Sequence, residues 1–389
     1  MSISIKPAGV ESNLPNQIIG KELFRQNDVS ESVLCEERGF PLLLRSNSKS
    51  TSPAQWIAQN QQKIQQSLNQ YGALLLRDFQ LSDENDFREA ANQFIPTIAK
   101  YMEGATPRTD LGKGTYTSTE FPNELSIAQH NELSYVTQWP MKIAFCCLVA
   151  PEQGGATPIA DVRQVLAFID KDVRDKFDAL GWTLVRNFGN GLGPTWQKSF
   201  NTHDIEEVKA YCQRAEIDLE VISEYQIRTR QTRPAIRRHI HTNEQVWFNH
   251  AAFWHPSSLC PIIRKELVSQ FGEDALTYNT LYGDGSVIED EVITHINEAY
   301  DKATVSLPWN KGDLMLMDNM LVSHGRAPFE GQRRIVVSMG DPFKPKNQRN
   351  NYVIFLLKKI QRDHAYLRSS ERFHCGGVSR PVSCGGRVW

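Results

Sequence analysis

The stretch from which the fold is predicted is Gln129-His130-Asn131-Glu132-Leu133-Ser134-Tyr135. In an extended strand alternate side chains share a face, so His130 and Glu132 would point to one side and Asn131 to the other. The Cα atoms of His130 and Glu132 would lie roughly 6.6 Å apart, near enough for an imidazole nitrogen and a carboxylate oxygen to converge on one metal ion. A half-exposed polar strand is the ordinary alternative for such a pair, so the metal prediction depends on a third ligand.

A second stretch, DNMLVSHGRAPFEGQRR over residues 318–334, supplies that ligand. His324 follows an apolar strand candidate and precedes a short loop that returns through an arginine pair into another apolar strand candidate. Two histidines and one carboxylate can bind one face of an iron(II) ion and leave its other positions open. We therefore predict that His130, Glu132 and His324 bind the metal and form the catalytic centre. Beside this set we expect no metal ligation by His239, His241, His250 or His255.

These segments resemble the TauD/TfdA superfamily of iron(II)/2-oxoglutarate-dependent dioxygenases. The sequence His130-Asn131-Glu132 is similar to the family's His-x-Asp/Glu motif, and GGATPIAD over residues 154–161 is similar to its GG-x-T turn. The stretch from His324 to the arginine pair is similar to its distal signature. The resemblance is nearest to the syringomycin-type β-hydroxylases of aminoacyl groups on carrier proteins. This nearer likeness is carried by Thr117–Pro122, Val185–Phe188 with Trp196-Gln197 and Phe200, Val246–His250, Tyr282–Gly285, and Pro308-Trp309 with Gly312-Asp313.

The resemblance implies the cofactors and the reaction. It implies iron(II), with 2-oxoglutarate and O2 as cosubstrates, and decarboxylation of 2-oxoglutarate to succinate coupled to hydroxylation of an aliphatic C–H bond. Related halogenases carry Gly or Ala at the position of Glu132, so the carboxylate here favours a hydroxylase.

The arginine pair is a candidate binding site for the cosubstrate. The distal carboxylate of 2-oxoglutarate suits the planar, bidentate guanidinium group of an arginine. Arg333 and Arg334 are adjacent, so in a strand only one of them faces inward. The resemblance implies that the second arginine of the pair binds the cosubstrate, which favours Arg334 over Arg333. Thr157 matches a family residue whose hydroxyl contacts the cosubstrate, although ordinary turn chemistry after Gly154-Gly155 explains it equally well.

The whole chain has the composition of a globular protein, with 389 residues, 40% hydrophobic residues, 23% charged residues and a formal charge of −2. This charge balance gives no indication of nucleic acid binding. No apolar run of about 18 residues is present, which argues against a membrane span. Scattered cysteines and an N-terminus unlike a secretory signal predict a reduced, cytoplasmic location.

The distribution of strand candidates predicts the architecture. They concentrate before residue 160 and after residue 305, with helices and long loops between them. We therefore expect a mainly β fold whose core is a double-stranded β-helix (a jelly roll, cupin-like) with helical insertions. The expected parts are a lead-in over residues 1–50, a catalytic domain over 51–343 with an inserted lid at about 162–300, and a basic, poorly ordered tail over 344–389.

The substrate follows from the resemblance alone. It implies an amino acid hydroxylated at its β-carbon, with the aminoacyl group tethered to a peptidyl carrier protein in natural-product biosynthesis. Two alternatives stay open: a hydroxylase of a free amino acid or small organic acid, similar to taurine dioxygenase, and a jelly-roll binding protein without catalysis. A run of arginines is either a solvated face or a binding surface for a substrate carboxylate or an acidic carrier protein. These arginines are Arg228, Arg230, Arg233, Arg237 and Arg238.

Overall fold

The computed structural model describes residues 22–26, 29–48, 50–98, 103, 108–191 and 193–345. The chain divides into two units, Met1–Phe343 and Lys344–Trp389, and the architecture below is that of the first unit. The predicted basic tail lies outside the described residues apart from Lys344 and Pro345. In the part of the chain that is described, no helix has both the length and the apolar character needed to cross a bilayer.

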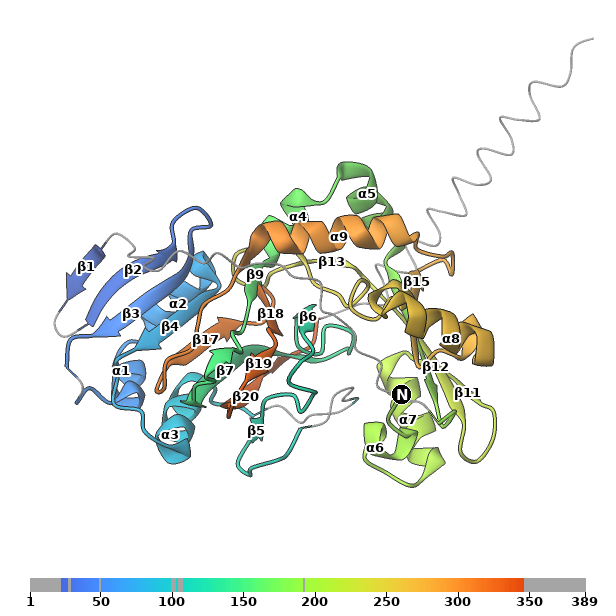
Figure 1. Ribbon diagram of the computed structural model, residues 1–389, viewed down its shortest axis with the longest axis horizontal. Coiled ribbons are helices and arrows are strands. Elements are labelled where there is room, and N and C mark those ends of the chain that lie inside the picture. The colour runs from blue at the N-terminus through green and yellow to red at the C-terminus, as the bar shows by residue number, and fades with distance from the viewer. Residues whose placement is uncertain are drawn as a thin grey trace, which may run out of the picture. The chain divides into compact units, whose positions relative to one another are not determined.

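An eight-stranded sheet forms one wall of the fold, in the order β1-β2-β3-β4-β17-β7-β20-β5 (Figure 1). Strand β3 pairs in parallel with β4, and the other pairings are antiparallel. The strands β1, β2 and β3 fall within residues 1–50, the expected lead-in. Because they pair into this sheet, that segment contributes to the domain. The strands are β1 (Glu22–Gln26), β2 (Val29–Cys35), β3 (Phe40–Ser46), β4 (Ala73–Arg77), β5 (Thr115–Thr117), β7 (Trp139–Val149), β17 (Leu314–Asp318) and β20 (Arg334–Phe343).

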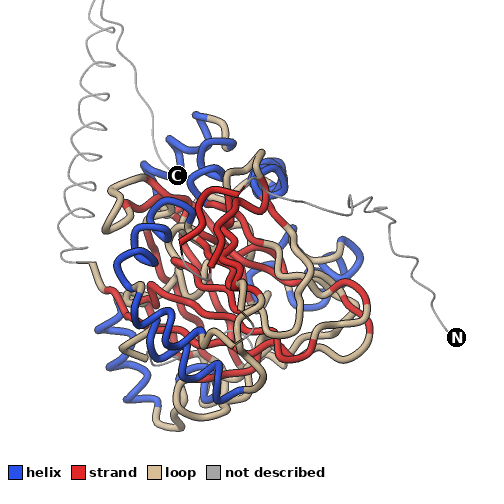
Figure 2. The backbone as a smooth tube through the Cα atoms, turned by 90° about the vertical axis from the view of Figure 1, so that its left-hand side faces the viewer, coloured by secondary structure: helices blue, strands red, loops and turns tan. Residues whose placement is uncertain are grey.

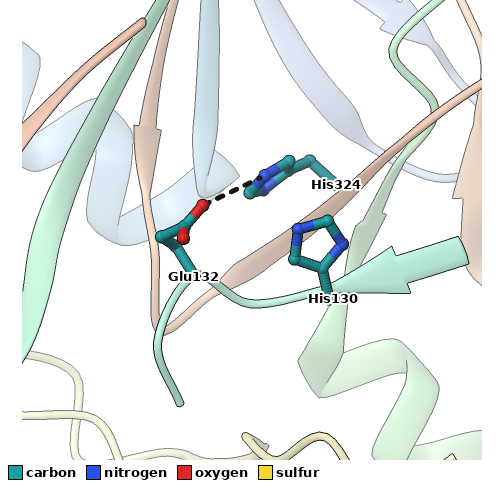
Figure 3. A group of neighbouring side chains, drawn as sticks. All are labelled: His130, Glu132 and His324. Carbon is teal, nitrogen blue, oxygen red and sulfur yellow. Dashed lines mark ion pairs between the residues drawn. The ribbon is translucent and has the colours of Figure 1, made fainter. Parts of the chain in front are cut away.

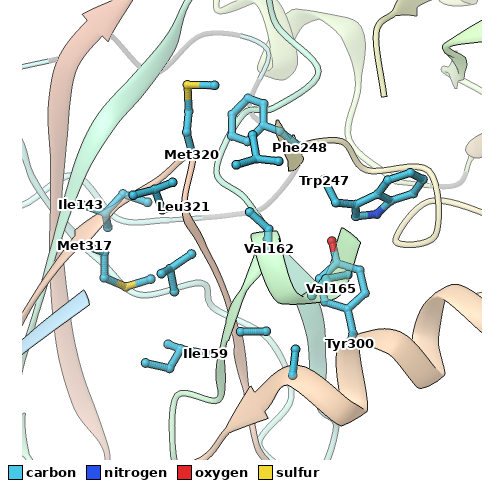
Figure 4. Packing of buried hydrophobic residues seen from close by; sticks show 14 of the residues in the cluster. Ile143, Ile159, Val162, Val165, Trp247, Phe248, Tyr300, Met317, Met320 and Leu321 are labelled. Carbon is cyan, nitrogen blue, oxygen red and sulfur yellow. The ribbon is translucent and has the colours of Figure 1, made fainter. Parts of the chain in front are cut away.

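A smaller sheet, in the order β16-β9-β18-β6, completes the jelly roll. The main hydrophobic core contains side chains from both sheets, and Figure 4 shows this packing around Met317, Ile159 and Val162. The predicted double-sheet core is confirmed. The strands are β6 (Ile127–His130), β9 (Ile159–Asp161), β16 (Thr304–Val305) and β18 (Val322–Arg326), and a two-stranded ladder pairs β8 (Gln153–Gly154) with β19 (Phe329–Glu330).

Three helices cover the outer face of the large sheet, namely α1 (Pro53–Gln59), α2 (Gln61–Tyr71) and α3 (Glu84–Phe94). Successive residues of a strand point to opposite faces, so Leu316 packs against these helices while Met317 packs into the core between the sheets. This alternation decides which polar side chains of the central strands can reach the interior.

The segment between β9 and β16 is an insertion that carries its own sheet, in the order β11-β12-β10-β15 (Figures 1 and 2). For this segment the sequence predicts helices and long loops, with strand candidates at Thr183–Phe188, Ile227–Arg230 and Glu244–Asn249. The structure has strands at all three places, and the main difference is that β10 and β12 form one sheet with β11 and β15, which were not predicted. The strands are β10 (Trp182–Phe188), β11 (Asp218–Val221), β12 (Ile227–Arg233), β13 (Ile236–Arg238), β14 (Gln245–Trp247) and β15 (Tyr278–Tyr282). The helices are α4 (Val162–Phe168), α5 (Lys171–Leu180), α6 (Trp196–Phe200), α7 (Ile205–Ala215), α8 (Pro261–Phe271) and α9 (Asp290–Ala303), with the 3₁₀ turns η1 (Pro256–Ser258) and η2 (Glu273–Ala275).

Candidate active site

Two histidines face each other across neighbouring strands of the small sheet. Strand β6 pairs with β18 so that His130 lies opposite His324, and the centroids of their rings are 4.5 Å apart. Both side chains are buried. The strand register therefore places side by side two imidazoles that are far apart in the sequence.

Glu132 reaches the histidines from a turn. Strand β6 ends at His130, and the chain turns over residues 131–135, with Leu133 in the left-handed region at φ 53°. The extended strand expected through Glu132 is therefore wrong, although the three side chains still meet. The Oε2 atom of Glu132 lies 3.9 Å from Nε2 of His324 (Figure 3). One ligand atom from each of the three residues lies within 4.8 Å of the others.

The protonation of the two histidines suits metal binding. Burial lowers the pKa of His130, and burial together with the neighbouring His130 holds the pKa of His324 well below its usual range. Both rings are therefore neutral near pH 7, the form that binds a metal. The Nδ1 atom of His130 lies 2.9 Å from the carbonyl oxygen of Ala128 and must donate to it, which leaves Nε2 with its lone pair free for a metal.

Arg333 faces the interior beside this centre. Its Nε donates to the carbonyl of Gly155 at 2.9 Å, and its Nη atoms lie 3.3 Å from Oγ of Ser118 and 3.4 Å from Oγ1 of Thr157. Burial lowers the pKa of Arg333 to about 10, so the guanidinium group stays charged at neutral pH. Arg333 and Thr157 thus form a charged, hydrogen-bonding end of a cavity that also borders His130 and His324.

Arg334 points the other way. Its Nη2 donates to Oε2 of Glu84 on α3 at 2.6 Å, and its side chain is 55% exposed. Ile335 shares the inward face with Arg333, whereas Val336 packs with the outer helices on the face of Arg334. The assignment of Arg334 to the cosubstrate is therefore wrong by one residue.

Residues 43–339 match the family described as "Taurine catabolism dioxygenase TauD, TfdA family". The chain belongs to this TauD/TfdA family. It is therefore an iron(II)/2-oxoglutarate-dependent dioxygenase, and the alternative of a non-catalytic binding protein is not retained. The donor set of two neutral imidazoles and one carboxylate fits the iron(II) ion that the family uses.

Individual proteins resemble this TauD/TfdA dioxygenase over most of their length. The "Dapdiamide synthesis protein DdaC" of Enterobacter agglomerans is 38% identical over 287 residues, which are 74% of this chain and 87% of that protein. The "Clavaminate synthase-like protein At3g21360" of Arabidopsis thaliana is 28% identical over 323 residues, 78% of this chain and 94% of that protein. The crystal structure of PvcB from Pseudomonas aeruginosa superposes with a TM-score of 0.50 at 17% identity, covering 82% of this chain and 93% of that one. This last similarity shows the fold alone.

The site of this TauD/TfdA dioxygenase also contains two arginines that the sequence analysis missed. Arg108 donates from Nη2 to Oε2 of Glu132 at 2.6 Å, and the two side chains are 4% and 6% exposed. Arg326 donates to the carbonyl oxygens of Phe121, Pro122 and Leu125 and so holds that loop beside the cavity. Arg108 belongs to no motif, whereas the position of Arg326 two residues after His324 could have indicated it.

The other clustered histidines have protein partners elsewhere. His239 Nε2 lies 3.0 Å from Oδ2 of Asp318, and His255 Nε2 lies 3.1 Å from the carbonyl oxygen of Ile288. His250 lies near the site, because its ring centroid is 5.8 Å from that of His130, but its Nδ1 is bonded to Oγ of Ser134 at 2.6 Å. Among the described residues the group of candidate metal ligands contains none of these histidines and not His241.

The arginine run is only partly a surface. Arg230 and Arg238 are exposed, but Arg233 is buried and donates to the carbonyl oxygens of Tyr135, Ala215 and Glu216. Arg237 lies over the ring of Trp139, 4.5 Å from its centroid. The five arginines therefore do not form one continuous basic surface. Strand alternation exposes some of them and buries others.

Proposed function

We propose that this dioxygenase hydroxylates an aliphatic C–H bond of an amino-acid substrate in natural-product biosynthesis, at the β-carbon of an aminoacyl group tethered to a peptidyl carrier protein. The observation that carries the proposal is the complete set of His130, Glu132 and His324 beside the buried Arg333. One similar protein is named for dapdiamide synthesis and another as clavaminate synthase-like, which supports a biosynthetic substrate.

One set of residues would bind the metal and another would bind the cosubstrate. His130, Glu132 and His324 would hold the iron(II) ion, which supplies the redox chemistry with O2 when it is bound. Arg333 would bind the distal carboxylate of 2-oxoglutarate, with the hydroxyl of Thr157 beside it. Because Arg333 and the two candidate histidine ligands, His130 and His324, border one cavity, a single cosubstrate molecule could reach both the arginine and the metal.

The charge of the cavity favours a second candidate function, hydroxylation of a free amino acid or small organic acid. Among the described residues, the side chains that line the cavity include Arg108, Arg326 and Arg333 and no carboxylate. Arg333 is assigned to the cosubstrate and Arg326 is bonded to its loop, and Arg108, which also donates to Oε2 of Glu132, lies at the metal end of the cavity. A substrate with a free carboxylate would fit that positive charge, which a thioester does not need.

Succinate formation from 2-oxoglutarate, with iron(II), ascorbate and O2, tests both candidates. We would compare free amino acids with the same aminoacyl groups loaded on a peptidyl carrier protein, using Glu132→Ala as the inactive control. Coupled turnover with the loaded carrier alone supports the first proposal. Turnover with free amino acids alone supports the second. Turnover by Glu132→Ala equal to that of the unaltered protein would contradict the site itself.

A further inference from the structure

The backbone of Glu132 is held by a side chain and not by a strand. Strand β6 ends at His130, so the N–H and C=O groups of Glu132 have no ladder partner. Asn319, in the turn between β17 and β18, takes that place. Its Oδ1 accepts from the N–H of Glu132 at 2.8 Å, and its Nδ2 donates to the carbonyl oxygen of Glu132 at 2.8 Å.

Asn319 is itself fixed on all sides. Its Nδ2 also donates to the carbonyl oxygen of Pro140 at 2.8 Å. Its backbone N–H donates to the carbonyl oxygen of Met141, also at 2.8 Å. Asn131, the residue between the two ligands His130 and Glu132, donates from its Nδ2 to the backbone carbonyl of Asn319 at 2.7 Å. Both asparagine side chains are fully buried. Their positions are therefore determined by hydrogen bonds within the core and not by solvent.

The pattern has a simple physical meaning. A primary amide offers one acceptor and two donors, so it can pair with a peptide group as a neighbouring strand would. The register of β6 and β18 positions His130 and His324, but it leaves Glu132, beyond the end of β6, without that support. The pair Asn319 and Asn131 provides the missing connection between the Glu132 turn and the chain that leads to His324.

We propose that Asn319, supported by Asn131, is a positioning residue that fixes Glu132 for metal binding. It touches neither the metal nor the substrates and acts only through the backbone of Glu132. Partners of metal ligands typically contribute about 10–100-fold to metal affinity. The inference concerns the metal centre and does not depend on which substrate the enzyme uses.

The test is Mn(II) binding to the full chain, with free Mn(II) measured by electron paramagnetic resonance. We expect Asn319→Ala to bind Mn(II) about 10–100-fold more weakly than the unaltered protein. The matched control is Asn187→Ala in β10. Asn187 is a buried asparagine that donates to the carbonyl of Leu276 at 2.7 Å and accepts from Nε of Arg228 at 2.8 Å, away from the triad. This control should lower the melting temperature and leave Mn(II) affinity unchanged.

Two results would overturn the proposal. One is an Asn319→Ala protein that folds and binds Mn(II) as tightly as the unaltered chain. The other is an equal loss of affinity in Asn187→Ala. If Asn319→Ala does not fold, Asn131→Ala decides, because it removes only one bond to the carbonyl of Asn319 and should weaken Mn(II) binding by a smaller factor. Failure of the unaltered protein to bind Mn(II) would instead contradict the assigned metal centre.

Discussion

Of two regions that each bury several charged side chains, only one has the geometry of an active site. The first is the metal site formed by His130, Glu132 and His324. The second consists of Glu103, Arg186, Tyr211 and Arg233, and we call it the Glu103 cluster. Arg186 and Arg233 come from the sheet of the insertion. Burial and charge are therefore common to both regions and do not identify the function.

The difference lies in what the polar atoms face. In the Glu103 cluster the hydroxyl of Tyr211 donates to Oε1 of Glu103 at 2.6 Å, and Arg233 donates to four carbonyl oxygens. Most donors and acceptors there satisfy one another, although Nε of Arg186 is buried without a hydrogen-bond partner among the described residues. In the metal site two imidazole rings and a carboxylate point their ligand atoms at one common position. Lone pairs that converge require a cation, whereas a network of matched donors and acceptors requires none.

The largest effect should come from the converging ligands. Replacing Glu132 with Gln keeps the size of the side chain but removes the negative charge that the metal needs. We expect Glu132→Gln and His324→Ala to lower turnover of 2-oxoglutarate roughly a thousandfold or more, because the bound metal contributes several kcal/mol to catalysis. Mn(II) binding and succinate formation measure the two losses. A variant that keeps full turnover would show that its residue is not a ligand.

The sequence was sufficient to single out the three candidate ligands, whose ligand atoms lie within 4.8 Å of one another, because each lies in a short motif of fixed spacing. It was not sufficient for the geometry of Glu132, since nothing in the residues 131–135 indicates that Leu133 adopts a left-handed conformation and ends the strand. The choice of Arg334 over Arg333 was wrong for a similar reason. A register shift of one residue exchanges the two faces of a strand, so Arg333 and Arg334 can be told apart only when the burial of Ile335 is known.

Arg108 and Asn319 could not be predicted because their roles depend on long-range contacts. Arg108 donates to the carboxylate of Glu132, and the side chain of Asn319 accepts from the backbone N–H of the same residue. Neither residue type at its position is unusual. The jelly roll could be predicted from the positions of apolar strands. In the insertion the sequence indicated strands at Thr183–Phe188 and Ile227–Arg230 but not their pairing with β11 and β15 in one sheet, because that pairing depends on long-range contacts.

The next effect separates the two arginines of the pair. Arg333→Lys should raise the KM for 2-oxoglutarate roughly 10–100-fold, since a lysine cannot make the bidentate pair and a charge-assisted hydrogen bond contributes about 1.5–3 kcal/mol. Arg334→Lys should leave this KM unchanged, because Arg334 forms an exposed pair with Glu84. Initial rates of succinate formation at varied 2-oxoglutarate provide both values. A raised KM in Arg334→Lys and an unchanged KM in Arg333→Lys would instead assign Arg334 to the cosubstrate.

A smaller and different effect is expected in the Glu103 cluster. Arg233→Ala removes the donors to the carbonyl oxygens of Tyr135, Ala215 and Glu216, and we expect the free energy of unfolding to fall by about 3 kcal/mol. Metal affinity should stay the same in the folded protein. Urea denaturation together with Mn(II) binding measures both quantities. If the variant is stable but binds Mn(II) poorly, the cluster is coupled to the site and the two regions are not independent.

The smallest effect is the pH dependence of stability that Glu103 contributes. Burial raises the pKa of Glu103, and the opposing contributions of Tyr211, Arg186 and Arg233 do not cancel it. The folded state therefore holds this proton more tightly than the unfolded chain does. The resulting contribution to stability is fully present below the ordinary pKa of a glutamate and is lost as the pH rises through the raised pKa. Glu103→Gln cannot titrate but can still accept from Tyr211, so the difference in melting temperature between variant and unaltered protein should shift in favour of the variant from acid to neutral pH. A difference that does not change with pH would mean that the partners of Glu103 fully compensate its charge. The Glu103 cluster would then be a fully matched network, in contrast to the converging ligands of the metal site.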